Sequence, residues 1–582
     1  MTIAIDPADW RRAVGARGLL RTFNEADVLE SADIHVAQRL TALAGESDES
    51  VALAIAMAVR AVRGGSVCVD LHTVAEHTGA PDLPWPSAQQ WIAAVKASPL
   101  TGRRAAVRIS DDGIVYLDRY WREEEQVAED LTTLLGTGVG YPVPDATRLF
   151  PPGFEEQRSA ADIALRQQLT VLTGGPGTGK TTTVARLLVL FGEQLRAAGR
   201  PRMRVALAAP TGKAAARLTE AVQGELQHLD AADRRGLEDL SATTLHRLLG
   251  SRPENSSRFR HDRSNRLPHD VIVVDETSMV SLTMMARLLE AVRPETRLVL
   301  VGDPDQLMSV EAGAVLADLV EGISARGDSQ VAALATSHRY GRSIGELAEA
   351  IRAGSADRAI EILRSGTESV HWIDTADPAP LLRKLLVARA VRLRDYAMAG
   401  DTASALAVLD EHRLLCAHRR GAYGIEYWNR LVERWLTETT GEIVRHPWYV
   451  GRPLLVTAND YGLGVYNGDT GITMSTQTDA EPAMRTVIAS ATGNLDITPG
   501  RLASVETMHA MTIHKSQGSQ ADEVTVLLPG PDSRLLTREL LYTAVTRAKS
   551  IVRVAGTEES VRRAIERRAV RATGLRGRLQ PR

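Results

Sequence analysis

One glycine-rich segment sets the strongest constraint on the fold of this chain. Residues 174–181 read Gly-Gly-Pro-Gly-Thr-Gly-Lys-Thr and match the pattern G-x-x-x-x-G-K-[ST]. A short apolar run precedes the segment, and Val184, Leu187 and Leu188 follow it at helical spacing. Backbone N–H groups and a helix N-terminus bind phosphates together, so such a loop needs a strand before it and a helix after it. The segment predicts a P-loop in an α/β fold that binds a nucleoside triphosphate.

The residues of the predicted P-loop have separate expected tasks. Lys180 is expected to reach the outer phosphates, and Thr181 to offer its hydroxyl group to Mg²⁺. ATP and Mg²⁺ are therefore the expected cofactors. The predicted nucleotide-binding residues of the loop are Gly174, Gly175, Pro176, Gly177, Thr178, Gly179, Lys180, Thr181 and Thr182.

Four short apolar runs predict a parallel sheet around this loop. Polar residues follow each run, and helical stretches separate the runs, which are residues 169–172, 205–209, 271–274 and 298–301. This pattern is typical of a parallel sheet covered by helices, with ligands at the carboxyl ends of the strands.

Acidic and amide side chains follow two of these runs. Asp275 is expected to bind the metal and Glu276 to polarise the attacking water. Gln306 could hydrogen-bond the γ-phosphate. Each role has a structural alternative, because an acidic residue after a strand can cap a helix and the segment before Gln306 can form a type I turn.

The chain is long enough for three to five domains, since single cores stop growing near 250–300 residues. Residues 1–142 look helical and carry no catalytic signature, and a glycine- and proline-rich connector near residue 140 marks their end. We expect an ATPase lobe over 143–345 and a second lobe over 346–582. Short strands and turns predict a small β insertion over 445–505. The arginine-rich tail from residue 562 is expected to be a solvated helix with a frayed end, with nucleic-acid contact as the alternative.

Composition limits the class of protein. The net charge of -3 provides no global basic field, so any DNA must bind in a local channel. Two cysteines are too few for a disulfide scaffold, which suits a reducing compartment. The first 20 residues lack the apolar segment of a signal peptide, and no run of 18 apolar residues occurs. We expect a cytoplasmic protein with no membrane contact.

Six motifs, in this order, resemble those of the superfamily 1 helicases, and in detail those of the RecD family, the alpha subunits of exodeoxyribonuclease V (RecBCD). They are residues 210–215, 275–279, 302–307, 309–313, 514–518 and 542–548. The resemblance covers about residues 150–560 and extends only weakly to 64–71. It implies two RecA-like lobes, an SH3-like form for the β insertion, and an ATP-dependent motor that moves 5′ to 3′ on single-stranded DNA. It also implies DNA ends as substrate, RecB- and RecC-like partners, and docking on them by residues 1–142. The alternative for this region is that it covers the first lobe and is needed for folding.

The resemblance also implies roles for individual residues. Gln157 would contact adenine, although a solvent-exposed glutamine is an equal alternative. Arg339 and Arg547 would reach the γ-phosphate from the second lobe, with Arg342 as a rival for Arg339 and surface ion pairing as the alternative for both. The DNA contacts would be Thr211, His246, Thr512, His514 and Ser516. One position departs from the family pattern, because Gln520 stands where a glutamate is usual, and this leaves nucleotide selectivity open.

The sequence predicts no nuclease centre of the PD-(D/E)-x-K type and leaves two alternative functions open. A PD-(D/E)-x-K nuclease centre needs an acid two residues before a lysine, and none of the six lysines has one. The residues at those positions are Ala94, Thr178, Thr211, Leu382, Ile513 and Arg547. A stand-alone RecD-like helicase would carry a longer N-terminal region. An ATP-switched structural subunit would not need Glu276, Gln306 and Arg547.

Overall fold

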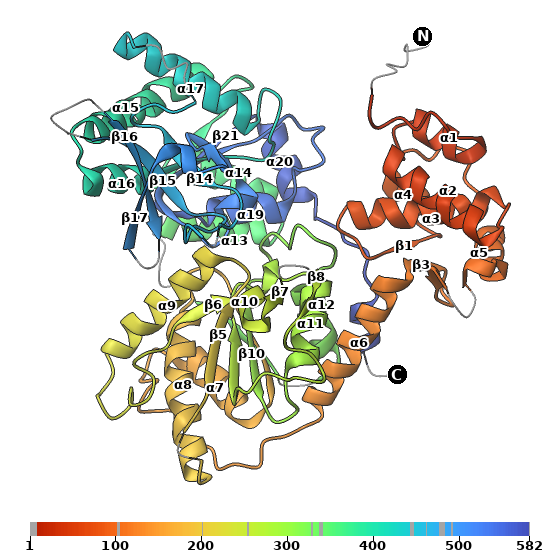
Figure 1. Cartoon of the computed structure of the whole chain (residues 1–582), viewed down its shortest axis with the longest axis horizontal. Coiled ribbons are helices and arrows are strands. Elements are labelled where there is room, and N and C mark those ends of the chain that lie inside the picture. The colour runs from red at the N-terminus through yellow and green to blue at the C-terminus, as the bar shows by residue number, and fades with distance from the viewer. Residues whose placement is uncertain are drawn as a thin grey trace.

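The structure is a computed structural model with two lobes and a smaller N-terminal region (Figure 1). It describes residues 9–101, 105–200, 202–252, 255–327, 330–336, 342–442, 447–460, 462–476, 483–490 and 493–580.

The first lobe contains a six-stranded parallel sheet in the order β11-β4-β10-β9-β5-β6. Its strands are β4 (Leu169–Gly174), β5 (Val205–Ala209), β6 (Ala242–Thr244), β9 (Val271–Val274), β10 (Arg297–Gly302) and β11 (Val331–Leu334). The four predicted strands are confirmed. The edge strands β6 and β11 were not predicted.

Helices cover both faces of this sheet, because its central strands are apolar on both sides. Val271 and Val273 of β9 pack with α7 (Glu155–Arg166), α8 (Lys180–Ala197) and α9 (Gly212–Gln227). Ile272 and Val274 face the other way, toward α11 (Leu282–Ala291) and α12 (Val315–Ala325). The lobe also includes α10 (Leu245–Leu249), the hairpin β7 (Ser251–Arg252) and β8 (Asn255–Phe259), and the 3-10 helix η2 (Thr277–Met279).

The second lobe contains a five-stranded parallel sheet in the order β12-β21-β20-β13-β19. Its strands are β12 (Val370–Ile373), β13 (His412–Cys416), β19 (Ala510–Thr512), β20 (Ala521–Leu527) and β21 (Ala548–Ala555). Its helices are α13 (Arg342–Arg352), α14 (Ala356–Ser365), α15 (Ala379–Met398), α16 (Thr402–Glu411), α17 (Ile425–Thr440), α18 (Ile513–Ser516), α19 (Arg538–Val545) and α20 (Glu558–Glu566). Helix α19 ends at Val545, because Ala548 already belongs to β21 and pairs with Ala521 of β20.

The segment of the predicted β insertion contains a five-stranded antiparallel sheet in the order β17-β16-β15-β14-β18. Its strands are β14 (Pro453–Val456), β15 (Thr470–Thr476), β16 (Ala483–Ser490), β17 (Gly493–Ile497) and β18 (Val505–Thr507), with η3 (Pro499–Arg501) between the last two. Its SH3-like form stays a prediction.

The N-terminal region contains the predicted helices and also a three-stranded antiparallel sheet that the sequence did not reveal. The helices are α1 (Gly18–Glu25), α2 (Ser31–Ala44), α3 (Glu49–Arg63), α4 (Val74–Thr78), α5 (Ala88–Ala97), η1 (Pro99–Thr101) and α6 (Asp118–Leu135). The strands are β1 (Cys68–Asp70), β2 (Val107–Ile109) and β3 (Ile114–Leu117). Strands of three or four residues are too short to show a clear alternating pattern.

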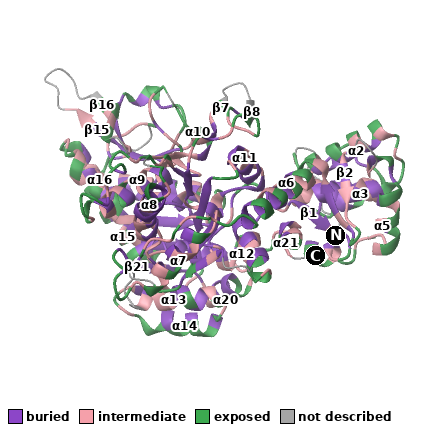
Figure 2. Ribbon diagram, turned by 90° about the horizontal axis from the view of Figure 1, so that it is seen from below, coloured by how far each residue is buried: buried purple, intermediate pink, exposed green. Residues whose placement is uncertain are grey.

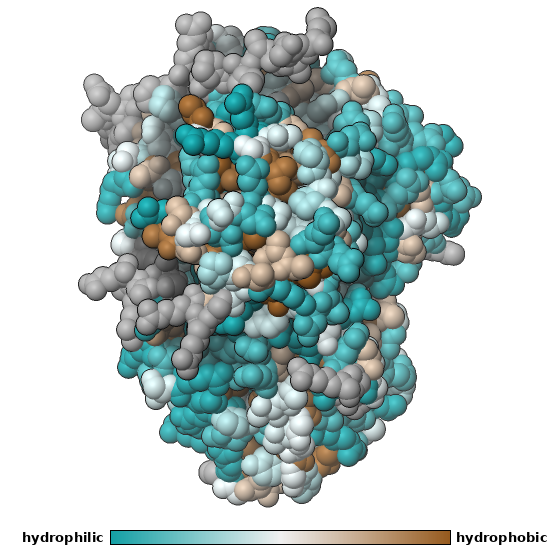
Figure 3. Space-filling view, turned by 90° about the vertical axis from the view of Figure 1, so that its right-hand side faces the viewer, coloured by the Kyte–Doolittle hydropathy of each residue, from teal (hydrophilic) through white to brown (hydrophobic). Residues whose placement is uncertain are grey.

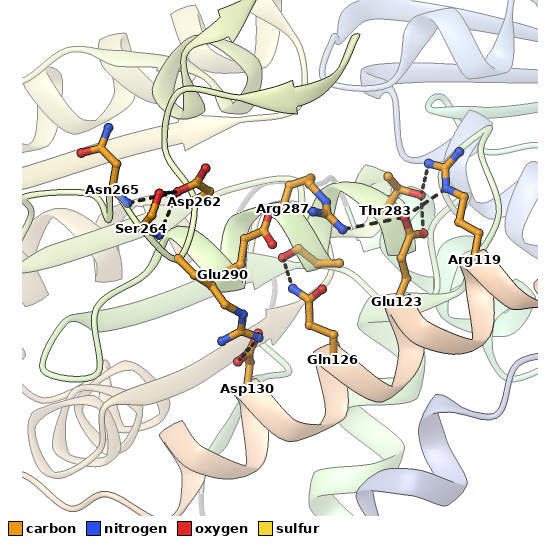
Figure 4. Close-up of polar contacts among 12 residues, drawn as sticks. Arg119, Glu123, Gln126, Asp130, Asp262, Ser264, Asn265, Thr283, Arg287 and Glu290 are labelled. Carbon is orange, nitrogen blue, oxygen red and sulfur yellow. Dashed lines mark hydrogen bonds and ion pairs between the residues drawn. The ribbon is translucent and has the colours of Figure 1, made fainter. Parts of the chain in front are cut away.

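Helix α6 joins this region to the first lobe by packing along α11 (Figure 4). The Thr283 hydroxyl donates to Glu123 at 2.7 Å, and the Gln126 amide donates to the Ala286 carbonyl at 2.9 Å. Further along, Arg263 pairs with Asp130 at 2.9 Å. The domain boundary at 142/143 stays a prediction. Helix α6, which precedes this boundary, packs against the first lobe.

The C-terminal tail, residues 567–580, also differs from the expectation of a solvated helix. It ends in α21 (Leu575–Leu579), which packs against α6 and α12 (Figure 2). Leu575 is 1% exposed and Leu579 is fully buried. These leucines lie four residues apart on one side of the helix, so they form an apolar stripe within an arginine-rich segment.

Candidate nucleotide site and adjoining cleft

A cavity of about 960 Å³ between the two lobes is the candidate nucleotide site. P-loop residues line it together with Gln157, Asp275, Glu276 and Gln306 of the first lobe. Gly518, Gln520 and Arg547 line it from the second lobe. The structure therefore brings together most of the residues that the sequence predicts for nucleotide binding and hydrolysis.

The P-loop connects β4 to α8, as its sequence requires. Gly177 and Gly179 have φ values of +83° and +85°, a backbone region that favours glycine. The Lys180 ammonium group donates to the carbonyl oxygens of Gly174 at 2.6 Å and Gly175 at 2.9 Å. Its position at the start of α8 points the charge along the loop that would hold the phosphates.

Asp275 and Glu276 follow β9 and face the P-loop. Burial, together with the neighbouring Glu276 carboxylate, raises the pKa of Asp275 to about 6. Glu276 is one of two non-glycine residues in the described chain with positive φ, at 51°. This left-handed conformation costs about 1–3 kcal/mol and is common at functional sites. It turns the chain sharply at the end of β9, so the two carboxylates can serve different partners.

Thr181 and Asp275 fit the predicted metal. Both line the cavity, and hydroxyl and carboxylate oxygens are ligands that suit Mg²⁺. Mg²⁺ usually keeps several waters and binds through one or two carboxylates plus phosphate oxygens. The described residues contain no group of three or more histidine, cysteine, aspartate or glutamate side chains that could hold a metal ion.

A network of hydrogen bonds crosses between the lobes at this cavity. The Arg547 guanidinium, 4% exposed, donates to the Gln306 side-chain oxygen at 3.0 Å. The Gln306 amide and the Tyr542 hydroxyl both donate to Asp303, at 3.0 and 3.1 Å. Surface ion pairing does not describe Arg547, because the side chain is buried. Arg339 lies outside the described residues, and its rival Arg342 begins α13.

Two residues of this network were missed by sequence reasoning. Asp303 and Tyr542 lie in motifs that carry the resemblance, but no role was predicted for either. The sequence signal that could have identified them is their position in motifs 302–307 and 542–548. Gln520, the departure from the family pattern, lines the same cavity, and its effect on nucleotide selectivity stays open.

Gln157 is 2% exposed, so the alternative of a solvent-exposed glutamine is wrong. Its amide donates to the Thr178 carbonyl at 3.3 Å, beside Phe154 at the rim of the cavity. We expect Gln157→Ala to raise the KM for ATP about 10-fold with kcat little changed. The substitution would remove the expected contact with adenine, which would be equally strong in the ground and transition states. Steady-state kinetics with ATP and GTP check this. An unchanged preference for ATP would contradict the adenine contact.

A second cavity of about 680 Å³ lies beside the nucleotide site. Four of the five predicted DNA contacts line it, namely Thr211, His246, Thr512 and His514. Ser516 does not, since it is buried and its hydroxyl donates to the Ile513 carbonyl at 2.7 Å. We call this cavity the cleft.

The side chains of the cleft offer neutral donors and local positive charge. Burial lowers the pKa of both His246 and His514, which keeps the imidazoles neutral at pH 7. Lys213, Arg419 and Lys515 also line the cleft, although sequence reasoning assigned them no DNA contact. Burial lowers the pKa of Lys213 to about 8, with Arg413 and Arg217 nearby. A cleft of this kind can hold a phosphate backbone despite the negative net charge of the chain.

Two parallel-sheet lobes, a P-loop with its acidic pair, and an arginine that crosses from the second lobe define a P-loop ATPase of the superfamily 1 helicase class. Family models match over three segments: "AAA domain" over residues 157–312, "UvrD-like helicase C-terminal domain" over 507–555, and "RecBCD enzyme subunit RecD, N-terminal domain" over 25–108. The chain belongs to the RecD family of RecBCD enzyme subunits.

Several known proteins are similar to this chain. The RecBCD enzyme subunit RecD of Mycobacterium tuberculosis (strain CDC 1551 / Oshkosh) is 66% identical over 98% of both chains. The ATP-dependent RecD2 DNA helicase of Deinococcus radiodurans is 32% identical over 83% of this chain and 61% of that protein. Among solved structures, a Pif1 helicase from Bacteroides in complex with ADP-AlF3 and single-stranded DNA has 15% identity and a TM-score of 0.37, covering 70% of this chain and 93% of that chain. No helix in the described residues is long and apolar enough to cross a membrane.

Proposed function

We propose that this chain is an ATP-dependent DNA helicase that moves 5′ to 3′ on single-stranded DNA, as the RecD subunit of a RecBCD-type repair complex. One observation carries the motor assignment. Gln306 lines the nucleotide cavity, and Ser309, three residues further along, lines the cleft. A shift of this loop in response to the γ-phosphate would therefore change the surface offered to DNA. The first test is ATP hydrolysis by the full-length chain, which should rise when single-stranded DNA is added.

The residues of the cavity divide the hydrolysis step among them. The P-loop backbone and Lys180 bind the phosphates, and Glu276 orients a water molecule for in-line attack and draws off its proton. Thr181 and Asp275 would hold Mg²⁺, which supplies neutralising charge for the phosphate oxygens. Arg547 reaches the site from the second lobe, where a guanidinium stabilises the charge of the transition state. Gln306 senses whether the γ-phosphate is present.

The subunit assignment rests on family membership. This chain is 66% identical to the RecD subunit of M. tuberculosis and 32% identical to the RecD2 helicase of D. radiodurans, which favours a subunit over a stand-alone helicase. DNA ends and RecB- and RecC-like subunits are the proposed partners. Work on chromosomal DNA would place the chain in the cytoplasm. Because no lysine follows an acid at the required spacing, we assign the chain no nuclease centre of its own.

The N-terminal region is the proposed docking surface for those subunits. Four exposed large hydrophobic side chains lie within its first helices and the segment before them, and Figure 3 shows apolar side chains among hydrophilic ones on this side of the molecule. They are Trp10, Val14, Val36 and Leu43. Exposed apolar side chains of this kind often supply the buried contacts of an interface.

We expect Leu43→Glu to weaken binding to the RecB- and RecC-like subunits about 10- to 100-fold, because burying a leucine contributes roughly 1.5–3 kcal/mol and a charge cannot replace it. Leu43 is 68% exposed, so the fold should tolerate the change. Leu381→Glu in α15, 64% exposed, is the matched control. Co-purification of the co-expressed subunits measures the effect. Equal recovery of partners by both variants would argue against docking at this surface.

A further inference from the structure

The C-terminal tail connects three parts of the molecule that are far apart in sequence. Residue Ala572 pairs with the N-terminal region, because Val67 N–H donates to its carbonyl at 3.0 Å and its own N–H donates to Ser66 at 3.1 Å. Further along, Gly574 N–H donates to the buried Glu124 carboxylate of α6 at 2.8 Å. The Thr573 hydroxyl donates to Asp318 of α12 at 2.7 Å. The tail therefore fixes the N-terminal region against the first lobe.

Arg571 lies where this tail meets the loop that follows Gln306. Its guanidinium donates to three backbone carbonyl oxygens of that loop, those of Ser309 at 2.5 Å, Glu311 at 2.9 Å and Gly313 at 2.8 Å. No other described side chain makes three such contacts to the loop. A planar guanidinium can donate to several carbonyls at fixed positions from separate nitrogens, whereas a lysine ammonium presents its donors from a single nitrogen.

The surroundings of Arg571 are built to hold it there. Gly65 has φ of +88°, and a Cβ at this glycine would lie 2.9 Å from the Arg571 Cζ, so only glycine allows the close approach. The Gly313 N–H donates to the Gly65 carbonyl at 2.9 Å, which joins the loop to the same turn. Burial lowers the pKa of Arg571 to about 10, so the side chain stays charged at neutral pH. Among the described residues, no carboxylate forms an ion pair with Arg571. Its guanidinium instead donates to the carbonyl oxygens of the loop.

The loop that Arg571 holds runs from the nucleotide cavity to the cleft. At one end Gln306 accepts from Arg547, and at the other Ser309, Val310 and Glu311 line the cleft. Val310 is 79% exposed at the loop tip. Arg571 is close enough to the cleft that its charge helps to lower the pKa of His514.

We propose that Arg571 is a positioning residue that holds the 309–313 loop in the shape that transmits the nucleotide state at Gln306 to DNA in the cleft. The inference rests on the proposed function, since it assumes that nucleotide and DNA bind at these two cavities. Arg571 itself contacts neither ligand. Because the tail also binds the Gly65–Val67 segment, the N-terminal region shares in setting the shape of this loop.

The test measures the coupling between the two ligands in the full-length chain. Fluorescence anisotropy gives the Kd for a labelled single-stranded oligonucleotide with and without a non-hydrolysable ATP analogue and Mg²⁺. In the wild-type chain the analogue should change this Kd by about 5-fold or more, the usual range of such coupling. In Arg571→Gln the ratio of the two Kd values should fall below about 2, while the Kd of the nucleotide measured without DNA stays within about 2-fold. Arg571→Lys should lie between the two.

Arg576→Gln is the matched control, because Arg576 belongs to the same tail and pairs with exposed Glu321 at 2.6 Å, away from the loop. It should keep the wild-type ratio. A wild-type ratio in both Arg571→Gln and Arg571→Lys would overturn the inference alone. A wild-type chain that binds no DNA would overturn the proposed function and this inference with it. If Arg571→Gln does not fold, the ratio of the two Kd values in Arg571→Lys decides. A loss of stability alone would not change this ratio in the folded protein.

Discussion

Lys180→Gln should reduce DNA-stimulated ATP hydrolysis by on the order of 10³-fold or more, the largest loss we expect from any single substitution in this chain. The change removes the positive charge that would neutralise the outer phosphates. It keeps much of the side-chain length, and an amide can still donate to the Gly174 or Gly175 carbonyl that Lys180 contacts. The loss should therefore appear in turnover and not in thermal stability.

The control for this prediction is Lys96→Gln, because Lys96 is exposed and pairs with Asp111 far from the cavity. Initial rates of phosphate release with saturating single-stranded DNA, together with melting temperatures, give the comparison. Hydrolysis that survives in folded Lys180→Gln protein would remove the P-loop from the mechanism.

Glu276→Gln should lower kcat by about 10²–10⁴-fold and still bind ATP. The substitution would remove the proposed base that orients water, while Asp275 would remain to hold Mg²⁺. The left-handed backbone at residue 276 should persist, since glutamine and glutamate meet the same steric cost. Nucleotide affinity from a fluorescent ATP analogue and turnover from phosphate release must be measured separately.

Glu361→Gln serves as the matched carboxylate control, because Glu361 is exposed on α14 and pairs only with Arg358 among the described residues. It should match the wild-type chain in both measurements. Equal losses of affinity and turnover in Glu276→Gln would show that Glu276 serves binding rather than chemistry.

The central strands and the nucleotide site could be predicted from the sequence because their signals are local. Val271–Val274 is buried on both faces, so it appears as an unbroken apolar run, and Asp275 and Glu276 must then stand at its carboxyl end. The P-loop fixes its own backbone through glycines. In contrast, the edge strand β6 is Ala-Thr-Thr, which carries no apolar signal.

Features that depend on side-chain direction or on distant contacts could not be predicted. His514 lines the cleft whereas Ser516, two residues later in α18, points into the core, because residues two apart in a helix face different sides. Arg571 contacts carbonyls about 260 positions earlier in the chain, a pairing that no local pattern encodes. The tail appears charged in sequence, yet Leu575 and Leu579 bury it against α6 and α12.

The most direct test of the central claim is strand separation by the full-length chain alone. Two fluorescently labelled duplexes, one with a 5′ single-stranded tail and one with a 3′ tail, are compared with ATP and Mg²⁺, and Glu276→Gln protein serves as the control. We expect ATP-dependent separation of the 5′-tailed duplex, little separation of the 3′-tailed duplex, and none with the variant. If the wild-type chain separates neither duplex although it hydrolyses ATP, or separates only the 3′-tailed one, the account of a 5′ to 3′ DNA motor is contradicted.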